Sequence, residues 1–254
     1  MIAAARDAYL LAERNLLRIR RNPDVLVGVT FQPIMFVVLF TYVFGGAIST
    51  PGFTYIDFFL PGIVVQMIAF TGYQTALGIS DDLRKGLIDR FRSLPMARSA
   101  VIAGRTASDI VMNTIALVTM VAFGIIVGFS FDSSVGEVIA GFALVLLFGY
   151  AMSWVYCYLG LIASTPESAS ALITIIIFPL TFVSSVYVPT SSMPAVMEAI
   201  ANANPITNVV NALRSLWIDA PAGNDVWVAV LWCIAITAVF SVLATTRYRR
   251  AVMR

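Results

Sequence analysis

The chain has 254 residues, of which 59% are hydrophobic and 12% charged, and its mean hydropathy is +0.89. These values exclude an ordinary soluble surface and place the chain in a lipid bilayer. The net charge of +2 is too small to indicate a nucleic-acid partner, and the absence of histidine excludes a histidine-based metal site or general base. Cys157 and Cys233 both stand in apolar runs, so we expect packing residues and neither a disulfide framework nor a zinc site.

Residues 1–22 predict an amphipathic helix that lies along the cytoplasmic membrane interface. Apolar residues recur there at helical spacing, and Asp7, Arg14, Arg18 and Arg21 fall on the opposite face. A contact with another protein is an equally good interpretation of this helix. The segment has no short apolar core with a small-residue cleavage site, so we expect no signal peptide.

Six apolar stretches follow, each long enough to cross a hydrocarbon core that takes about 20 residues. The predicted spans are 25–46, 58–80, 98–129, 138–163, 168–188 and 226–246. Thr165 and Pro166 suit the N-cap and first turn of the fifth span. Segments 193–203 and 208–218 have helical character but are too short to cross, so we expect external helices that pack on the outer surface. The sequence predicts an all-α integral membrane protein with a single transmembrane domain.

A dense charged block over residues 81–98 separates the second span from the third. Read as a helix over about 82–95, it is amphipathic. Its apolar face consists of Leu83, Leu87, Ile88, Phe91 and Leu94. Such a stripe is buried either in the membrane interface or in a groove on another protein, and periodicity alone does not choose between them.

The basic residues indicate how the spans are oriented. They form groups at 6–21, 84–105 and 247–254, with Arg214 as the external exception. Cytoplasmic loops carry the excess of Lys and Arg in membrane proteins. Six spans with both termini in the cytoplasm place all three groups on that side, whereas five or seven spans would not.

Two sets of motifs resemble one known family. The first set is 55–66 (YIDFFLPGIVVQ), 81–100 (DDLRKGLIDRFRSLPMARSA) and 104–109 (GRTASD). The second is Met193-Pro194 followed by 204–214 (NPITNVVNALR). Both resemble the type-2 ABC exporter permeases and, within them, the daunorubicin-resistance, multidrug branch. The resemblance covers nearly the whole chain.

The resemblance implies that the charged block is a coupling helix seated in a groove of a separate ATPase subunit. The implied coupling residues are Arg84, Lys85, Leu87, Ile88, Asp89, Arg90, Phe91, Arg92, Leu94 and Pro95, together with Glu167. It also implies two ATPase copies that hold ATP and Mg²⁺, and a second permease chain, identical or related. The implied activity is export of amphiphilic drugs, antibiotics or lipids across the plasma membrane.

The chain itself has no phosphate-binding loop. No G-x-x-x-x-G-K-[ST] sequence occurs, and the single lysine, Lys85, precedes Gly86. We therefore expect no ATP hydrolysis, cofactor or metal in this chain. Paired intramembrane acids and histidine relays are also absent from the sequence, which disfavours a proton-coupled transporter.

Amides and aromatic residues in the first two spans are the candidate translocation pathway. They are Gln32, Phe36, Gln66, Phe70, Tyr73 and Gln74. Because a polar side chain is costly when it faces lipid, the amides should face a pathway or a packed interface. Aromatic rings beside amides suit a poorly hydrated, amphiphilic cargo. Bundle packing is the alternative for the aromatic residues.

Two further functions stay open. One is export of a lipid-linked polysaccharide or cell-envelope lipid, and the other is a membrane scaffold or insertase that moves no cargo. A copurifying ATPase would favour the exporter, and its absence would favour the scaffold.

Overall fold

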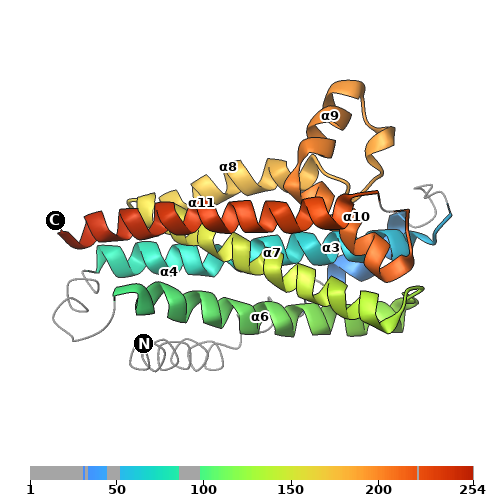
Figure 1. Ribbon diagram of the computed structural model, residues 1–254, viewed down its shortest axis with the longest axis horizontal. Coiled ribbons are helices and arrows are strands. Elements are labelled where there is room, and N and C mark those ends of the chain that lie inside the picture. Colours follow the sequence, from blue (N-terminus) through green and yellow to red (C-terminus); the bar gives the residue numbers. More distant parts are fainter. Residues whose placement is uncertain (1–30, 32–33, 45–51, 86–97, 222, 254) are drawn as a thin grey trace.

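The computed structural model describes residues 31, 34–44, 52–85, 98–221 and 223–253, and the regular structure within them is helical. The helices form an elongated bundle (Figure 1). They are η1 (Phe40–Phe44), α3 (Tyr55–Thr71), α4 (Tyr73–Arg84), α6 (Arg98–Val127), α7 (Val135–Ile162), α8 (Pro166–Phe182), η2 (Thr190–Ser192), α9 (Ala195–Ala203), α10 (Pro205–Ile218) and α11 (Asp225–Met253). The predicted all-α class is confirmed. The predicted interfacial helix at 1–22 and the coupling helix from Gly86 onward lie outside the described residues.

Within the described residues, four helical stretches are long and apolar enough to cross a membrane. They are Tyr55–Arg84, Ser108–Val127, Val135–Ile162 and Asp225–Tyr248. Of two shorter apolar helices, Ile34–Val43 lies within the predicted first span and Pro166–Phe182 overlaps the predicted fifth span. These lengths indicate a multi-pass membrane protein. The count of six spans stays a prediction.

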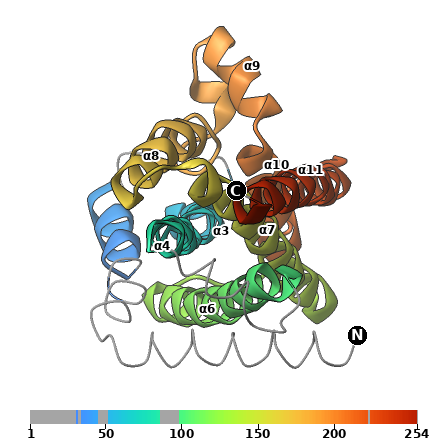
Figure 2. The same ribbon diagram turned by 90° about the vertical axis from the view of Figure 1, so that its left-hand side faces the viewer.

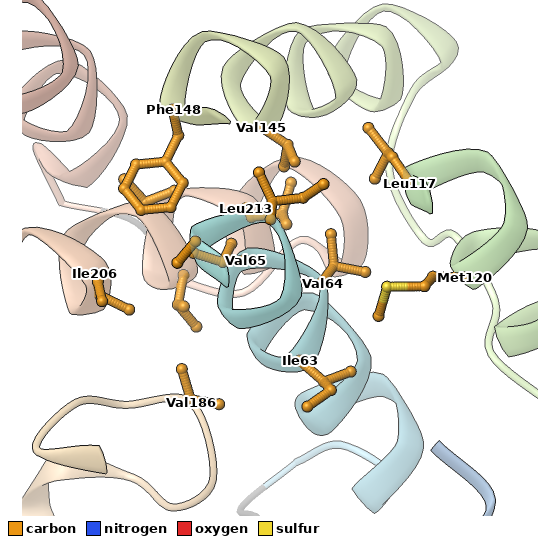
Figure 3. Close-up of a cluster of buried hydrophobic side chains, with 14 of the residues drawn as sticks. Ile63, Val64, Val65, Leu117, Met120, Val145, Phe148, Val186, Ile206 and Leu213 are labelled. Atoms are coloured by element: carbon orange, nitrogen blue, oxygen red, sulfur yellow. The ribbon is translucent and has the colours of Figure 1, made fainter. Parts of the chain in front are cut away.

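Helix α3 lies at the centre of the bundle (Figure 2). It is apolar on all sides, and its residues 55–66 are all buried. A helix that is hydrophobic all round belongs in an interior, because no face of it is suited to water. The neighbouring segments cover Ile63, Val64 and Val65 (Figure 3). Their covering side chains include Leu117 and Met120 of α6, Val145 and Phe148 of α7, Ile206 and Leu213 of α10, and Val186.

The second span is a broken helix, whereas the sequence pattern predicts one helix over 58–80. Gly72 separates α3 from α4. The ring of Tyr156 on α7 occupies the place where a β-carbon on Gly72 would be, and the Tyr156 hydroxyl donates to the carbonyl oxygen of Ala69. A side chain inserted into the helical hydrogen-bond ladder is a recognised cause of a kink. The prediction missed the break because Gly72 does not interrupt the apolar periodicity.

Helix α8 begins as predicted and ends early. The Thr165 side chain accepts a hydrogen bond from the backbone N–H of Ser168, and Pro166 occupies the first turn. The helix stops at Phe182 and not near Val188. Its last carbonyls are satisfied from outside, because the amide of Asn204 donates to the carbonyl of Leu180 at 2.6 Å and to that of Val183 at 2.7 Å.

Helix α10 corrects the prediction that both short helices pack on the outer surface. Ile206, Val209, Leu213 and Trp217 on α10 are 0% exposed, and the helix packs against α3, α7 and α11. α9 does project from the bundle (Figure 1), and its Val196 is 73% exposed. α10 is buried although it carries polar side chains, because Thr207, Asn211 and Arg214 find hydrogen-bond partners in the segments around it.

The two ends of the bundle differ in charge. The end that carries the C-terminus also holds the end of α4 and the start of α6 (Figure 1). The exposed Arg84 and Lys85 lie there, at the end of α4. At the opposite end the α6–α7 turn meets α10, where the Asp132 N–H donates to the carbonyl of Trp217. That end carries acidic residues, namely Asp132, Glu137, Asp219 and Asp225. The arrangement agrees with the basic end being cytoplasmic.

Candidate functional site

At the basic end of the bundle, the structure describes the predicted coupling region up to Lys85. Arg84 and Lys85 are exposed, and the Lys85 ammonium lies 2.6 Å from a carboxylate oxygen of Asp81 one turn earlier. The predicted coupling residues Leu87, Ile88, Asp89, Arg90, Phe91, Arg92, Leu94 and Pro95 lie outside the described residues. Their contact with an ATPase therefore stays a prediction.

Glu167 lies beside this end. Its carboxylate is exposed at the first turn of α8, before the apolar part of that helix. Hydrogen bonds from its own backbone N–H and from the Thr165 side chain lower the pKa of the Glu167 carboxyl, and the positive charge of Arg84 lowers it further. The structure thus places two of the predicted coupling residues, Glu167 and Arg84, within electrostatic reach of each other at the basic end.

Side-chain hydrogen bonds join the inner half of the second span to its neighbours. The hydroxyl groups of Tyr73 and Ser170 lie 2.6 Å apart, which links α4 to α8. Thr75 donates to a carboxylate oxygen of Asp109 on α6 at 2.7 Å. Polar bonds inside a membrane bundle hold helices in a fixed relation, since lipid offers the groups no other partner. α4 is therefore attached to the parts of α6 and α8 that lie toward the basic end.

An aromatic cluster lies between the first span, α3 and the end of α8. Phe40 stacks on Phe36 at 5.8 Å and on Phe59 at 5.0 Å between ring centroids. Tyr187 lies 5.3 Å from Phe40 and 5.3 Å from Phe182. We call these five residues, Phe36, Phe40, Phe59, Phe182 and Tyr187, the aromatic cluster. The rings of Phe36, Phe40 and Phe59 are stacked, whereas the Tyr187 ring is tilted against Phe40 and Phe182.

The cluster opens onto the surface of the bundle at α8. Phe182 is 48% exposed, and Phe178, which stacks on it at 4.3 Å, is 49% exposed. Phe36 and Phe40 are half-buried, so rings from both the first span and α8 reach the surface. Exposed apolar side chains are ordinary on a lipid-facing surface, so it is the stacking of these rings that makes the cluster a candidate surface for a planar, apolar molecule.

The predicted pathway residues divide into two groups. Phe36 belongs to the aromatic cluster, and Gln66 borders it, because Gln66 accepts a hydrogen bond from Tyr187 at 2.7 Å. Phe70 and Tyr73 are half-buried further along the second span, and Gln74 is exposed. Gln32 lies outside the described residues.

Sequence reasoning missed Phe40, Phe59, Phe182 and Tyr187. Tyr187 lies in the turn that follows α8, where the sequence pattern predicted the end of a straight span. Its position just before Pro189, at a chain reversal, was the available signal. The rings of Phe40 and Phe59 stand in apolar runs, and no pattern distinguishes them from ordinary packing residues.

Comparison with known proteins decides the family. The sequence profile of the ABC-2 type transporter family matches residues 6–217. The chain belongs to this family. This permease is 33% identical, over 93% of its length and 83% of the relative, to the daunorubicin resistance ABC transporter permease protein DrrB1 of Streptomyces coeruleorubidus. The predicted family is confirmed.

Two more distant relatives cover a similar part of the permease. A probable doxorubicin resistance ABC transporter permease protein, DrrC, of Mycobacterium tuberculosis is 21% identical over 96% of this chain and 89% of its own. The inner membrane transport permease YadH of Escherichia coli is 21% identical over 85% of this chain and 87% of its own. The names of these relatives and the family imply a membrane permease that works with an ABC ATPase subunit.

Proposed function

We propose that this permease is the membrane subunit of an ATP-driven exporter of planar, amphiphilic drugs or lipids from the plasma membrane. The energy comes from two copies of a separate ATPase that bind ATP and Mg²⁺, and the permease works beside a second chain, identical or related. The termini lie in the cytoplasm. Cargo that binds the inward-facing and outward-facing states with different affinity is moved when ATP binding and hydrolysis interconvert the states.

The aromatic cluster is the observation that supports this cargo. Its rings stack with centroids 5.0–5.8 Å apart between the first span and α3, and Phe178 and Phe182 present further rings at the surface. A planar aromatic cargo would extend this stack, with each ring pair contributing about 0.5–1.5 kcal/mol. The hydroxyl group of the half-buried Tyr187 donates to the buried Gln66, so its oxygen can still accept a hydrogen bond from the hydrophilic part of an amphiphile.

Transport into inverted membrane vesicles tests the proposal. The vesicles contain the permease and its ATPase, and daunorubicin is the fluorescent probe. We expect ATP-dependent accumulation, with an apparent affinity that Phe182→Ala weakens by about 2- to 10-fold, the equivalent of one lost ring contact. Trp227→Ala is the matched control, because Trp227 is a 74% exposed aromatic residue on α11, away from the cluster.

Two results would contradict the proposed cargo. One is absence of ATP-dependent drug accumulation by an assembled, ATP-hydrolysing complex. The other is an equal loss of affinity in Phe182→Ala and Trp227→Ala. Accumulation of a fluorescent lipid without any drug transport would favour the cell-envelope lipid alternative.

Partner binding is tested separately with Phe91→Ala. A buried aromatic anchor in a protein groove commonly contributes about 2 kcal/mol or more to binding, whereas an exposed rim charge contributes much less. We expect Phe91→Ala to reduce pull-down of the ATPase and export together at an unchanged membrane level, and Arg92→Ala to change both much less. Full retention of the ATPase by Phe91→Ala would show that this face only contacts lipid.

A further inference from the structure

Arg214 is a buried cation in the acidic half of the bundle. It lies on α10 and is 5% exposed. Its Nε donates to the carbonyl of Phe58 on α3 at 3.0 Å, and its Nη2 donates to the carbonyl of Ser185 at 2.7 Å. The guanidinium carbon lies 3.5 Å from the centroid of the Phe58 ring. One side chain thus joins three segments that are distant in the sequence.

Arg214 is the last residue of a polar stripe on α10. Asn204, Thr207, Asn211 and Arg214 are three or four residues apart, so they share one face of the helix. Each contacts the end of α8 or the turn that follows it. Besides the Asn204 bonds described above, Thr207 accepts from the Ser185 N–H at 3.1 Å and Asn211 accepts from the Ser185 hydroxyl at 2.9 Å.

The turn after α8 is also attached to α3 directly. Val186 is 0% exposed, and its carbonyl oxygen lies where a β-carbon on Gly62 would be, so the two backbones touch. Tyr187 bonds Gln66 one turn further along α3. We call α3, α10 and residues 183–187 the outer clamp.

The inner half of the second span, α4, packs mainly against α7 and α8. α4 is bonded to α6 and α8 through Thr75 and Tyr73, and the break at Gly72 separates it from α3. α4 ends at Arg84, just before the predicted coupling residues, so we expect a shift of those residues to act first on α4. Whether the movement of α4 also displaces the turn after α8 depends on how firmly α3 holds that turn.

We propose that Arg214 is a positioning residue of the transport cycle, which keeps the outer clamp closed as one body while α4 moves at Gly72. The inference rests on the proposed function, because it concerns the coupling of ATP hydrolysis to cargo movement. Opening the clamp would leave a guanidinium and at least two carbonyl groups without partners in an apolar interior, which is strongly unfavourable. The forked geometry of arginine is needed, since its separate N–H groups reach two carbonyls on different segments.

The test measures cargo moved per ATP hydrolysed by the assembled complex. We expect the Arg214→Gln complex to hydrolyse ATP but to move on the order of tenfold less cargo per ATP. A factor of this size corresponds to the loss of one buried hydrogen bond to a charged group. Arg214→Lys should lower the cargo moved per ATP similarly, because one ammonium does not reach both carbonyls. Ser215→Ala is the matched control, since Ser215 bonds the Ala212 carbonyl within α10 alone. An unchanged ratio in Arg214→Gln, or full restoration by lysine, would overturn the inference.

A cysteine pair keeps the inference testable if Arg214→Gln does not accumulate. In Ser185→Cys/Asn211→Cys, with Arg214 intact, a disulfide or a short thiol cross-link fixes the clamp. We expect the same ATP hydrolysis and the same export before and after cross-linking, because the clamp stays closed throughout. Inhibition that a reductant reverses would show that the clamp opens and would overturn the inference. The ATP-hydrolysis part of this comparison needs no cargo, so that part remains valid if the proposed cargo is wrong.

Discussion

The hydroxyl of Tyr187 donates a hydrogen bond to Oε1 of Gln66 at 2.7 Å. The bond gives the side-chain oxygen of Gln66 a partner in the middle of a predicted span. Gln66 is buried there, with 3% of its surface exposed. Gln74, two turns further along the same span, is exposed. Gln66 and Gln74 are both amides of the predicted second span, but one is buried and bonded and the other is exposed.

We predict different effects from truncating these two glutamines. Gln74→Ala should change which amphiphilic compounds are exported and leave stability nearly unchanged. Gln66→Ala should lower stability by about 1–3 kcal/mol, because it leaves the Tyr187 hydroxyl without its acceptor. Resistance profiles over a compound panel and unfolding temperatures in detergent measure the two effects. If both variants merely lose abundance, the pathway assignment of Gln74 fails.

Gly72→Ala should destabilise the permease by about 1–3 kcal/mol, because the new methyl group overlaps the Tyr156 ring and a packed core does not absorb it without strain. Gly136→Ala is the control, since a β-carbon there meets open space. The measurement is the midpoint of thermal unfolding, which shifts by about 2–4 °C per kcal/mol for a chain of this size. Equal midpoints for the two variants would show that Tyr156 moves aside freely.

Two tryptophans provide a matched test of the acidic end. Trp217 is 0% exposed, contacts the rings of Phe129, Phe131 and Phe142, and donates from Nε1 to the carbonyl of Val138 at 3.3 Å. Trp217→Ala should cost about 3–5 kcal/mol of stability. Trp227→Ala, at an exposed position on α11, should change the unfolding midpoint little. A small effect at Trp217 would contradict the buried position of α10.

The orientation in the membrane follows from the charge difference between the two ends. We expect Ser134→Cys and Ser192→Cys to react with a membrane-impermeant maleimide added to intact cells, because both serines are exposed in the part of the bundle opposite the basic end. Thr246→Cys, exposed on α11 near the basic end, should react only after the cells are opened. The reverse pattern would invert the topology.

The helical class and the position of most spans were predictable, since long apolar runs and N-cap residues are local properties of the sequence. Thr165 at the start of α8 is an example, because its cap involves residues three apart. The early end of α8 was not predictable. It depends on the Asn204 amide, which reaches α8 only after the chain has reversed.

In the candidate site, too, some residues were predictable from the sequence and others depend on contacts between distant segments. Phe36 and Gln66 were predicted, because an amide or an aromatic ring stands out within a span. Tyr187, which completes the aromatic cluster and bonds Gln66, was not, since its role depends on the turn that brings it back to α3. The burial of Arg214 was also missed, because positive charge in an external segment is ordinarily interpreted as exposed.

The bond between Arg214 and Phe58 also has a consequence for the order of biosynthesis. The two residues are 156 positions apart, so the central helix α3 leaves the ribosome long before α10 exists. Helices of membrane proteins insert first and pack together afterwards. We therefore expect α3 to enter the bilayer without its final neighbours and to mature only when the last third of the chain has arrived. A ribosome stalled just after α8 would hold an immature permease that protein quality control recognises by its unpacked second span.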